Sequence, residues 1–367
     1  MKRQKHPKIG QKNIGNYGVS EFALVGISNS TIKNFVISIS KKISSLKITF
    51  LDKNEEVSSD VIVSFVDGQE VSSTENKIDV DVSFSSFELR TFFKNCDLTL
   101  VNGNYFDGRK QLLFIGEKES LSNDLGKIKN PVAVVLKNEV KELPKALLGN
   151  KPEVVNLPIF KMDDLKGITD FICSQSVFKP KLKGLVLVGG KSTRMGEDKA
   201  MLNYHGQPQW KYSYELLSQF CDDVFVSVGE EDDRFSEVAQ IQDKFLGMGP
   251  LGGILSAFQS DPNSAWLVVA CDLPLLSQAS LHQLVVSRNP QKYATSFQSP
   301  QMDFPEPLIC IWEPKAYGKL LEFLSWGYSS PMKTLVNSDI ELVIPNHENE
   351  MANANTPEEY RRLKGLL

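Results

Sequence analysis

A glycine-rich stretch in the middle of the chain carries residues that could bind phosphate groups. It reads LVLVGGKSTRMGEDKAML and covers residues 185–202. Gly189 and Gly190 follow an apolar run directly, so the backbone can turn sharply and bring its N–H groups close to phosphate oxygens. Three cations follow within this stretch, Arg194 and Lys199 among them, and they could offset much of the charge of a triphosphate. These residues together predict a polyphosphate site.

The loop by itself leaves a second interpretation open. Its spacing matches neither the Walker pattern G-x-x-x-x-G-K-[ST] nor the dinucleotide pattern G-x-G-x-x-G. Two glycines after a strand can also form an ordinary tight turn, and clustered Lys and Arg are commonly a solvated surface.

Two aspartates are candidates for the same site. Asp272, in VVACDLPLL, follows an apolar run and could supply the hard oxygen ligand that a Mg²⁺ bridging phosphates needs, or it could cap a turn. Asp243, in IQDKFLGMGPLGGI, precedes a second glycine-rich turn that opens a helix at Pro250. That turn would place a carboxylate and close backbone beside a nucleotide, or it is a simple helix start.

The elements around these residues alternate between strand and helix. The apolar pattern predicts strands at 184–190, 222–229 and 265–274, with helices at 208–220, 249–259 and 277–287. A glycine loop after the first strand and an acid at the end of a later one predict a doubly wound, mostly parallel sheet whose site lies at the carboxyl ends of its strands.

The first half of the chain shows a similar alternation. It predicts strands at 21–26, 46–52, 61–68, 97–104 and 131–138, with helices at 32–43 and 85–95, which favours a parallel α/β sheet. A polar segment at 174–184 carries a proline and several lysines and separates the halves. We therefore expect two α/β domains, at 1–178 and 183–367.

Composition narrows the class of protein. The chain has 367 residues, enough for two cores, and a net charge of -4 that gives no electrostatic footprint for nucleic acid. No apolar run approaches the ~20 residues of a membrane span, and none follows the basic opening as in an export signal, so we expect a cytoplasmic protein. Five scattered cysteines without a C-x-x-C pair argue against a disulfide framework or a structural zinc.

Four segments together resemble the molybdenum cofactor guanylyltransferases. They are LVGGKSTRMGEDKA, the Asp243 segment with GPLGGI, the segment CDLP, and the terminal NANTPEEY. The resemblance extends from 183 to 367 and implies the Rossmann-like nucleotidyltransferase fold. Sugar-1-phosphate and cytidylyltransferase relatives usually have a proline before the loop lysine, where this chain has Asp198.

The resemblance implies roles for individual residues. Arg194, Lys199 and Asp272 would be catalytic, with Asp272 holding Mg²⁺, and Asn353 and Asn355 would bind molybdopterin. The GTP site would comprise Leu187, Val188, Gly189, Gly190, Lys199, Ser227, Asp243 and Asp272. The chain departs from some family members at Ser227, where they have asparagine, and at Glu306, where they have a histidine before Pro307.

The implied reaction joins GMP from GTP to molybdopterin, or to its molybdenum-loaded form, and releases pyrophosphate. Molybdoenzymes and other cofactor-biosynthesis proteins are the further partners it suggests, with no nucleic acid and no membrane. Two alternatives stay open. One is cytidylyl or another nucleotidyl transfer to molybdopterin or to a phosphorylated metabolite, and the other is a non-catalytic nucleotide-binding regulator.

The first half faintly resembles the P-loop adapter protein of molybdopterin-guanine dinucleotide synthesis, in FALVGISNSTIKN and DLTLVNGN. Thr31 stands where that family has its second glycine, Ile32 where it has the lysine, and Asn102 where it has an acid. Such a loop loses its phosphate wrap and its charge. We expect a degenerate, P-loop-like adapter domain fused to the enzyme, unless Lys33 replaces the missing lysine or the domain is an unrelated α/β fold.

Overall fold

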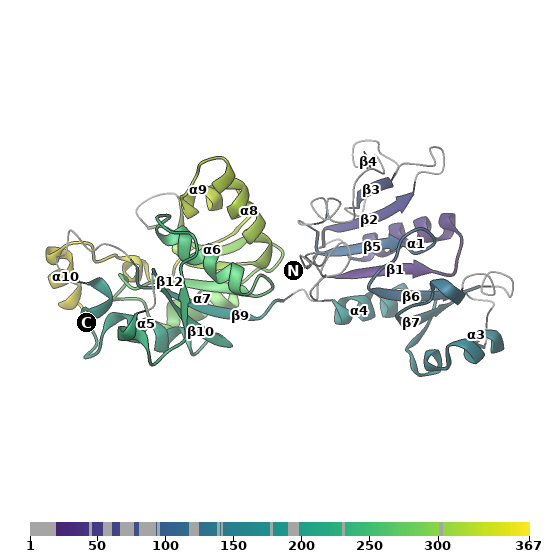
Figure 1. Ribbon diagram of the computed structural model, residues 1–367, viewed down its shortest axis with the longest axis horizontal. Coiled ribbons are helices and arrows are strands. Elements are labelled where there is room, and N and C mark those ends of the chain that lie inside the picture. Colours follow the sequence, from purple (N-terminus) through teal and green to yellow (C-terminus); the bar gives the residue numbers. More distant parts are fainter. Residues whose placement is uncertain are drawn as a thin grey trace, which may run out of the picture. The chain divides into compact units, whose positions relative to one another are not determined.

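The chain forms two compact units, Met1–Phe178 and Lys179–Leu367, in a computed structural model. Each unit has its own sheet (Figure 1). Each also has its own hydrophobic clusters. The structure describes residues 20–43, 46–53, 93, 96–116, 125–137, 140, 142–176, 179–189, 198–229, 232–300 and 304–367, and the backbone of 61–66 and 77–80. Within these residues, no helix has the length and apolar character that crossing a bilayer requires.

The first unit is built on a sheet of eight strands in the order β4-β3-β2-β5-β1-β6-β7-β8. Its strands are β1 (Glu21–Val25), β2 (Ile48–Lys53), β3 (Val61–Val66), β4 (Lys77–Val80), β5 (Leu98–Asn102), β6 (Lys110–Ile115), β7 (Pro131–Leu136) and β8 (Ile159–Lys161). Its helices are α1 (Asn29–Lys42), α3 (Lys145–Asn150) and α4 (Leu165–Gln175).

This sheet is mostly parallel, as predicted, but not entirely. The strands β2, β5, β1, β6, β7 and β8 run parallel to their neighbours in that series, whereas β3 is antiparallel to both β2 and β4. Alternate side chains of β1 serve the two faces: Phe22 and Leu24 pack with α1 and α4, and Ala23 and Val25 pack on the other side. The helix predicted at 85–95 lies outside the described residues, apart from residue 93.

The second unit is built on a sheet of seven strands in the order β11-β10-β9-β12-β14-β13-β15. Its strands are β9 (Leu182–Leu187), β10 (Asp223–Val228), β11 (Gln240–Gln242), β12 (Ala265–Ala270), β13 (Ala294–Gln298), β14 (Pro305–Trp312) and β15 (Glu341–Val343). Its helices are α5 (Gln209–Leu217), α6 (Pro250–Ser260), α7 (Gln278–Val286), α8 (Pro314–Ser325), α9 (Pro331–Val336) and α10 (Pro357–Lys364).

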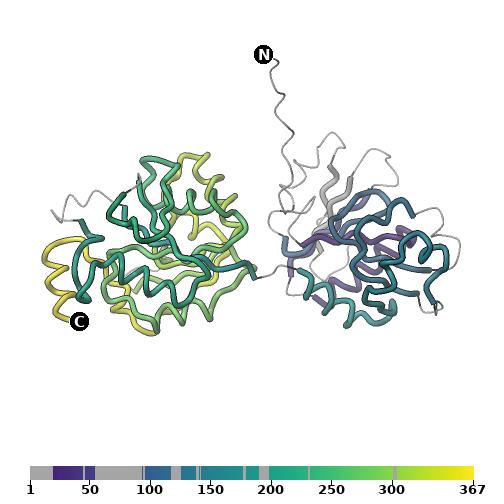
Figure 2. The backbone as a smooth tube through the Cα atoms, turned by 60° about the horizontal axis from the view of Figure 1, so that its bottom comes forward, coloured from purple at the N-terminus to yellow at the C-terminus, as the bar shows by residue number. Residues whose placement is uncertain are grey.

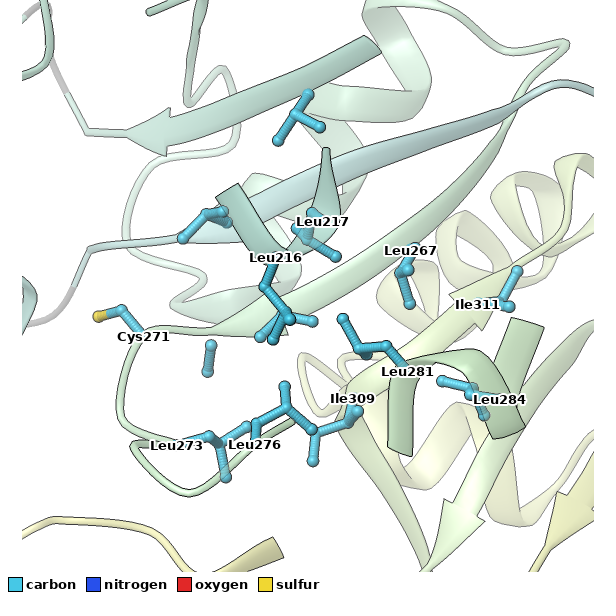
Figure 3. Close-up of a cluster of buried hydrophobic side chains, with 14 of the residues drawn as sticks. Leu216, Leu217, Leu267, Cys271, Leu273, Leu276, Leu281, Leu284, Ile309 and Ile311 are labelled. Carbon is cyan, nitrogen blue, oxygen red and sulfur yellow. The ribbon is translucent and has the colours of Figure 1, made fainter. Parts of the chain in front are cut away.

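Helices cover both faces of the second sheet, which makes it doubly wound as predicted. Apolar side chains of α6 and α8 pack on one face of the sheet, and those of α5 and α7 pack on the other. Figure 1 shows where these helices lie in the second unit. In the cluster on the face of α5 and α7, the sheet contributes Leu267 and Ile311, and the helices contribute Leu216, Leu217, Leu281 and Leu284 (Figure 3). Both faces of the central strands are therefore buried, and this explains why their apolar runs are nearly continuous.

The order of the strands reverses at β9. The chain leaves β9 for β10 on one side and later returns to β12 on the other, and both neighbours are parallel to β9. Crevices of this kind, at the carboxyl ends of parallel strands, are where open α/β sheets bind ligands. The β14 strand is antiparallel to both β12 and β13, so the sheet is mixed beyond that point.

Candidate active site

Gly189, where the predicted glycine loop begins, and Asp272 both follow strands that meet at this reversal point. Leu187, the last residue of β9, is in register with Ala270, the last residue of β12. The Cys271 N–H continues the pairing by donating to the Leu187 carbonyl at 3.2 Å. The strand therefore ends two residues before Asp272, which lies in the following turn with its side chain 19% exposed.

Three predicted site residues meet beside this turn. The Lys199 ammonium lies 3.3 Å from the Asp272 carboxylate and donates to the Asn355 side-chain oxygen at 2.6 Å. Lys199 opens a short 3-10 helix (Lys199–Met201) that Asp198 caps by accepting from the Ala200 N–H. A cation, a carboxylate and an amide from three distant parts of the chain thus share one half-buried position.

Side chains of α5 and of the segment before it hold the turn after Asp272, and the sequence did not predict these contacts. The side chains of Gln209, His205 and Tyr212 bond the carbonyls of Leu273, Pro274 and Leu276 at 3.3, 2.8 and 2.9 Å, respectively. The His205 ring also stacks on Tyr212, at a centroid distance of 3.6 Å. These carbonyls lie outside the strands and need other hydrogen-bond donors. Residues of α5, together with His205, supply them and so fix the turn that carries Asp272.

A second pair of predicted residues lies one strand away. The Ser227 hydroxyl donates to the Asp243 carboxylate at 2.8 Å, and Ser227 is in register with Leu187. Burial raises the pKa of Asp243, and the hydrogen bond from Ser227 partly opposes that rise. Gly253 of α6 packs here so closely that a Cβ atom would meet the Ser227 hydroxyl. The second glycine-rich turn therefore lets α6 approach β9 and β10.

The remaining predicted residues are less closely gathered. Val188 is half-buried, Gly189 and Asn353 are exposed, and Gly190 and Arg194 lie outside the described residues. Glu306 lies in β14, where its carbonyl accepts from the Ser296 hydroxyl at 2.8 Å.

Side chains of the first unit bond to one another around the loop between β1 and α1. Lys33 forms an ion pair with Asp52 at 3.4 Å, and Asp52 is buried. Asn102 donates to Asp52 at 2.7 Å and to Asn29 at 3.1 Å, and Asn104 donates to Asn29 at 2.8 Å. Lys33 therefore faces a carboxylate of its own domain.

Comparison with known proteins identifies the family of the second unit. A family model described as a MobA-like NTP transferase domain matches residues 184–338. A molybdenum cofactor guanylyltransferase of Xanthomonas euvesicatoria pv. vesicatoria is 31% identical over 185 residues, which cover 49% of this chain and 93% of that protein. The chain belongs to the molybdenum cofactor guanylyltransferase family. The guanylyltransferase resemblance of residues 183–367, the α/β fold class and the nucleotidyltransferase class expected from the sequence are thereby confirmed.

Other relatives of this guanylyltransferase family extend the match. A molybdenum cofactor biosynthesis bifunctional protein of Synechocystis is 28% identical over 290 residues, 78% of this chain and 76% of that protein. Since Lys179–Leu367 is about half of the chain, this match extends into the first unit. The crystal structure of molybdopterin-guanine dinucleotide biosynthesis protein A from Archaeoglobus fulgidus covers 50% of this chain and 97% of its own, at 21% identity and a TM-score of 0.43.

Proposed function

We propose that this protein transfers GMP from GTP to molybdopterin, in its free or molybdenum-loaded form, and releases pyrophosphate. The observation that carries the proposal is the meeting of Lys199, Asp272 and Asn355 at the carboxyl ends of β9 and β12. The family relatives supply the substrate class, and the position at the strand reversal supplies a reason for a nucleotide to bind there.

The chemistry of the transfer explains the kinds of residue at the site. An oxygen of the molybdopterin phosphate attacks the α-phosphorus of GTP in line, and the bond from that phosphorus to the β-phosphate oxygen breaks. The electron pair leaves with pyrophosphate, so negative charge grows at the leaving oxygens. Lys199, with Arg194 from the glycine-rich loop, would offset this charge. A phosphate monoester is already an anion near neutral pH, so the reaction needs no general base.

A magnesium ion fits the donor set in one specific way. Asp272 would hold it, and the described residues contain no group of three or more His, Cys, Asp or Glu that could enclose a metal by themselves. Magnesium sites in such enzymes commonly use one or two carboxylates, with phosphates and water as the other ligands. When bound, the ion would neutralise phosphate oxygens beside Asp272. The Lys199 ammonium, which contacts the same carboxylate and Asn355, would lie close to those phosphate oxygens.

Identification of the dinucleotide product tests the proposal. The full-length protein is incubated with Mg²⁺, molybdopterin and each nucleoside triphosphate separately, and the products are weighed by mass spectrometry. We expect molybdopterin guanine dinucleotide from GTP. If CTP is used as fast as GTP, the enzyme is not a guanylyltransferase, and if no triphosphate reacts, the site belongs to a non-catalytic nucleotide binder.

For the first unit, we propose a degenerate adapter role without nucleotide binding. Its sheet order places β5, which ends at Asn102, directly beside β1, which leads into the loop and α1. The ion pair of Lys33 with Asp52 supports this proposal, because the one lysine near the lost position already has a buried partner. Covalent attachment would keep such an adapter at high effective concentration near the enzyme.

A further inference from the structure

The start of the last helix has an extended hydrogen-bond arrangement. Thr356 caps α10 by accepting from the Glu359 N–H at 3.2 Å, and the Glu359 carboxylate accepts from the Thr356 N–H at 3.0 Å. These two bonds make a capping box. The same Glu359 oxygen also accepts from the Asn355 N–H at 2.7 Å, which a capping box does not require.

That additional bond fixes a residue of the candidate active site. The side-chain oxygen of Asn355 is the atom that accepts from Lys199 at 2.6 Å. On the other side of Asn355, the Ala354 N–H donates to the Asp272 carbonyl at 2.9 Å. The Asn355 backbone is therefore held from both directions, by the Asp272 turn and by Glu359.

The helix that carries Glu359 is itself anchored beside the Lys199 segment. The ring of Tyr360 packs edge-on against Tyr204 at a centroid distance of 4.8 Å, and Leu363 is buried with Leu202. The tube of the C-terminal helix, in yellow, accordingly runs alongside the teal segment of this unit (Figure 2). Glu359 thus lies on a helix that packs against the segment that follows Lys199.

We propose that Glu359 is a positioning residue for guanylyl transfer: it holds Asn355 so that the Asn355 side chain keeps the Lys199 ammonium at the Asp272 carboxylate. This inference rests on the proposed function. Small displacements of groups that align phosphates reduce rates strongly, so we expect the loss of Glu359 to reduce turnover through Asn355 and Lys199.

Four single substitutions in the full-length protein separate positioning from helix stability. Glu359→Ala removes all the carboxylate bonds, whereas Glu359→Gln keeps an oxygen that can accept from both N–H groups. Thr356→Ala removes the hydroxyl that caps the helix and leaves the Glu359 carboxylate to hold Asn355. Glu358→Ala is the surface control, since its side chain is 75% exposed.

We expect Glu359→Ala to lower kcat/KM for molybdopterin roughly tenfold, while Glu359→Gln, Thr356→Ala and Glu358→Ala stay within about twofold of the wild type. In an Asn355→Ala background, Glu359→Ala should cause almost no further decrease in kcat/KM, because the side chain that links Glu359 to Lys199 is already absent. The positioning role is overturned if Thr356→Ala and Glu359→Ala lower kcat/KM equally, or if Glu359→Ala keeps wild-type activity. It is also overturned if Glu359→Ala lowers kcat/KM in the Asn355→Ala background as much as it does in the wild type.

Hydrogen exchange of residues 352–356, followed by mass spectrometry, provides a readout that does not depend on activity. The positioning role predicts faster exchange in Glu359→Ala than in Thr356→Ala. If the wild-type protein transfers no GMP but exchange is faster in Glu359→Ala than in Thr356→Ala, the proposed function is wrong and the positioning of Asn355 stands. Equal exchange in the two variants overturns the positioning role whether or not the protein transfers GMP.

Discussion

Backbone hydrogen bonds on both sides of Asp272 keep this residue at the strand reversal independently of its side chain. The Cys271 N–H bonds Leu187, and the Asp272 carbonyl accepts from Ala354. A change confined to the carboxylate should therefore leave the turn in place. For this reason Asp272 can be tested for chemistry with little risk of testing folding.

We predict that Asp272→Asn folds normally and loses GMP transfer by roughly 10²-fold or more, because metal-ion charge stabilisation is worth several kcal/mol. Circular dichroism checks the fold, and product formation from GTP checks the activity. Near-normal turnover in a folded variant would remove Asp272 from the mechanism.

The half-buried carboxylate of Asp243 predicts a pH dependence of stability. Burial raises its pKa in the folded state above that in the unfolded state, so the folded protein retains the Asp243 proton to higher pH. The stabilisation from this group is complete below its unfolded-state pKa of about 3.9 and is lost as the pH rises through the folded-state value.

Asp243→Asn removes this titration and keeps an oxygen that can accept from Ser227. We predict that the free energy of unfolding of the variant, relative to the wild type, increases between pH 3.5 and pH 7. Urea unfolding at the two pH values measures this difference. A relative stability that falls over the same interval would mean that the folded site favours the ionised carboxylate.

At the scale of elements, two glycines let α6 pack closely: Gly252 against the segment that precedes the helix, and Gly253 against β9 and β10. A Cβ atom at Gly252 would lie 2.5 Å from the Phe245 carbonyl oxygen, and one at Gly253 would lie 2.8 Å from the Leu187 side chain. The helix begins after Gly249, whose φ of 57° suits glycine. The segment GPLGGI therefore encodes how closely this helix packs.

We predict that Gly253→Ala lowers the free energy of unfolding by about 1–3 kcal/mol, the usual cost of overpacking. Both Ser227 and Leu187 would have to move away from the new methyl group. Gly229→Ala is the matched control, because in the part of the chain that the structure describes no atom beyond its chain neighbours lies within 4 Å of its Cβ position. Equal melting temperatures for Gly253→Ala and the wild type would show that α6 can shift without cost.

At the scale of the whole molecule, the hydrophobic clusters divide between the two units. The clusters of α1, α3 and α4 draw their members from the first unit, and those of α5 to α8 and α10 draw theirs from the second. Since each unit buries its own core, we expect each to fold when it is expressed alone.

We predict that residues 1–178 alone bind no GTP·Mg²⁺, because the lysine near the lost position pairs with Asp52. We predict that residues 179–367 alone retain GMP transfer. Calorimetric titration and the product assay test the two pieces. Micromolar binding to the first piece and none to the second would move the active site to the first unit. A second piece that folds and binds GTP without transferring GMP would show that catalysis requires the first.

The sequence by itself determined the features that depend on neighbouring residues. An acid after an apolar strand predicts a turn at that point, and the structure has Asp272 in the turn that follows β12. The doubly wound sheet also followed from local periodicity, because burial on two faces requires apolar residues at successive strand positions.

Tertiary structure alone decided which distant residues meet. Lys199 and Asn355 are 156 residues apart, and their contact requires β12 to return beside β9 and the last helix to dock on Tyr204. The antiparallel pairing of β3 and the filling of the first loop by Asn29, Asn102 and Asp52 were likewise absent from the prediction. Periodicity reports which face of an element is buried, but strand order and side-chain partners depend on how the whole chain closes its sheet.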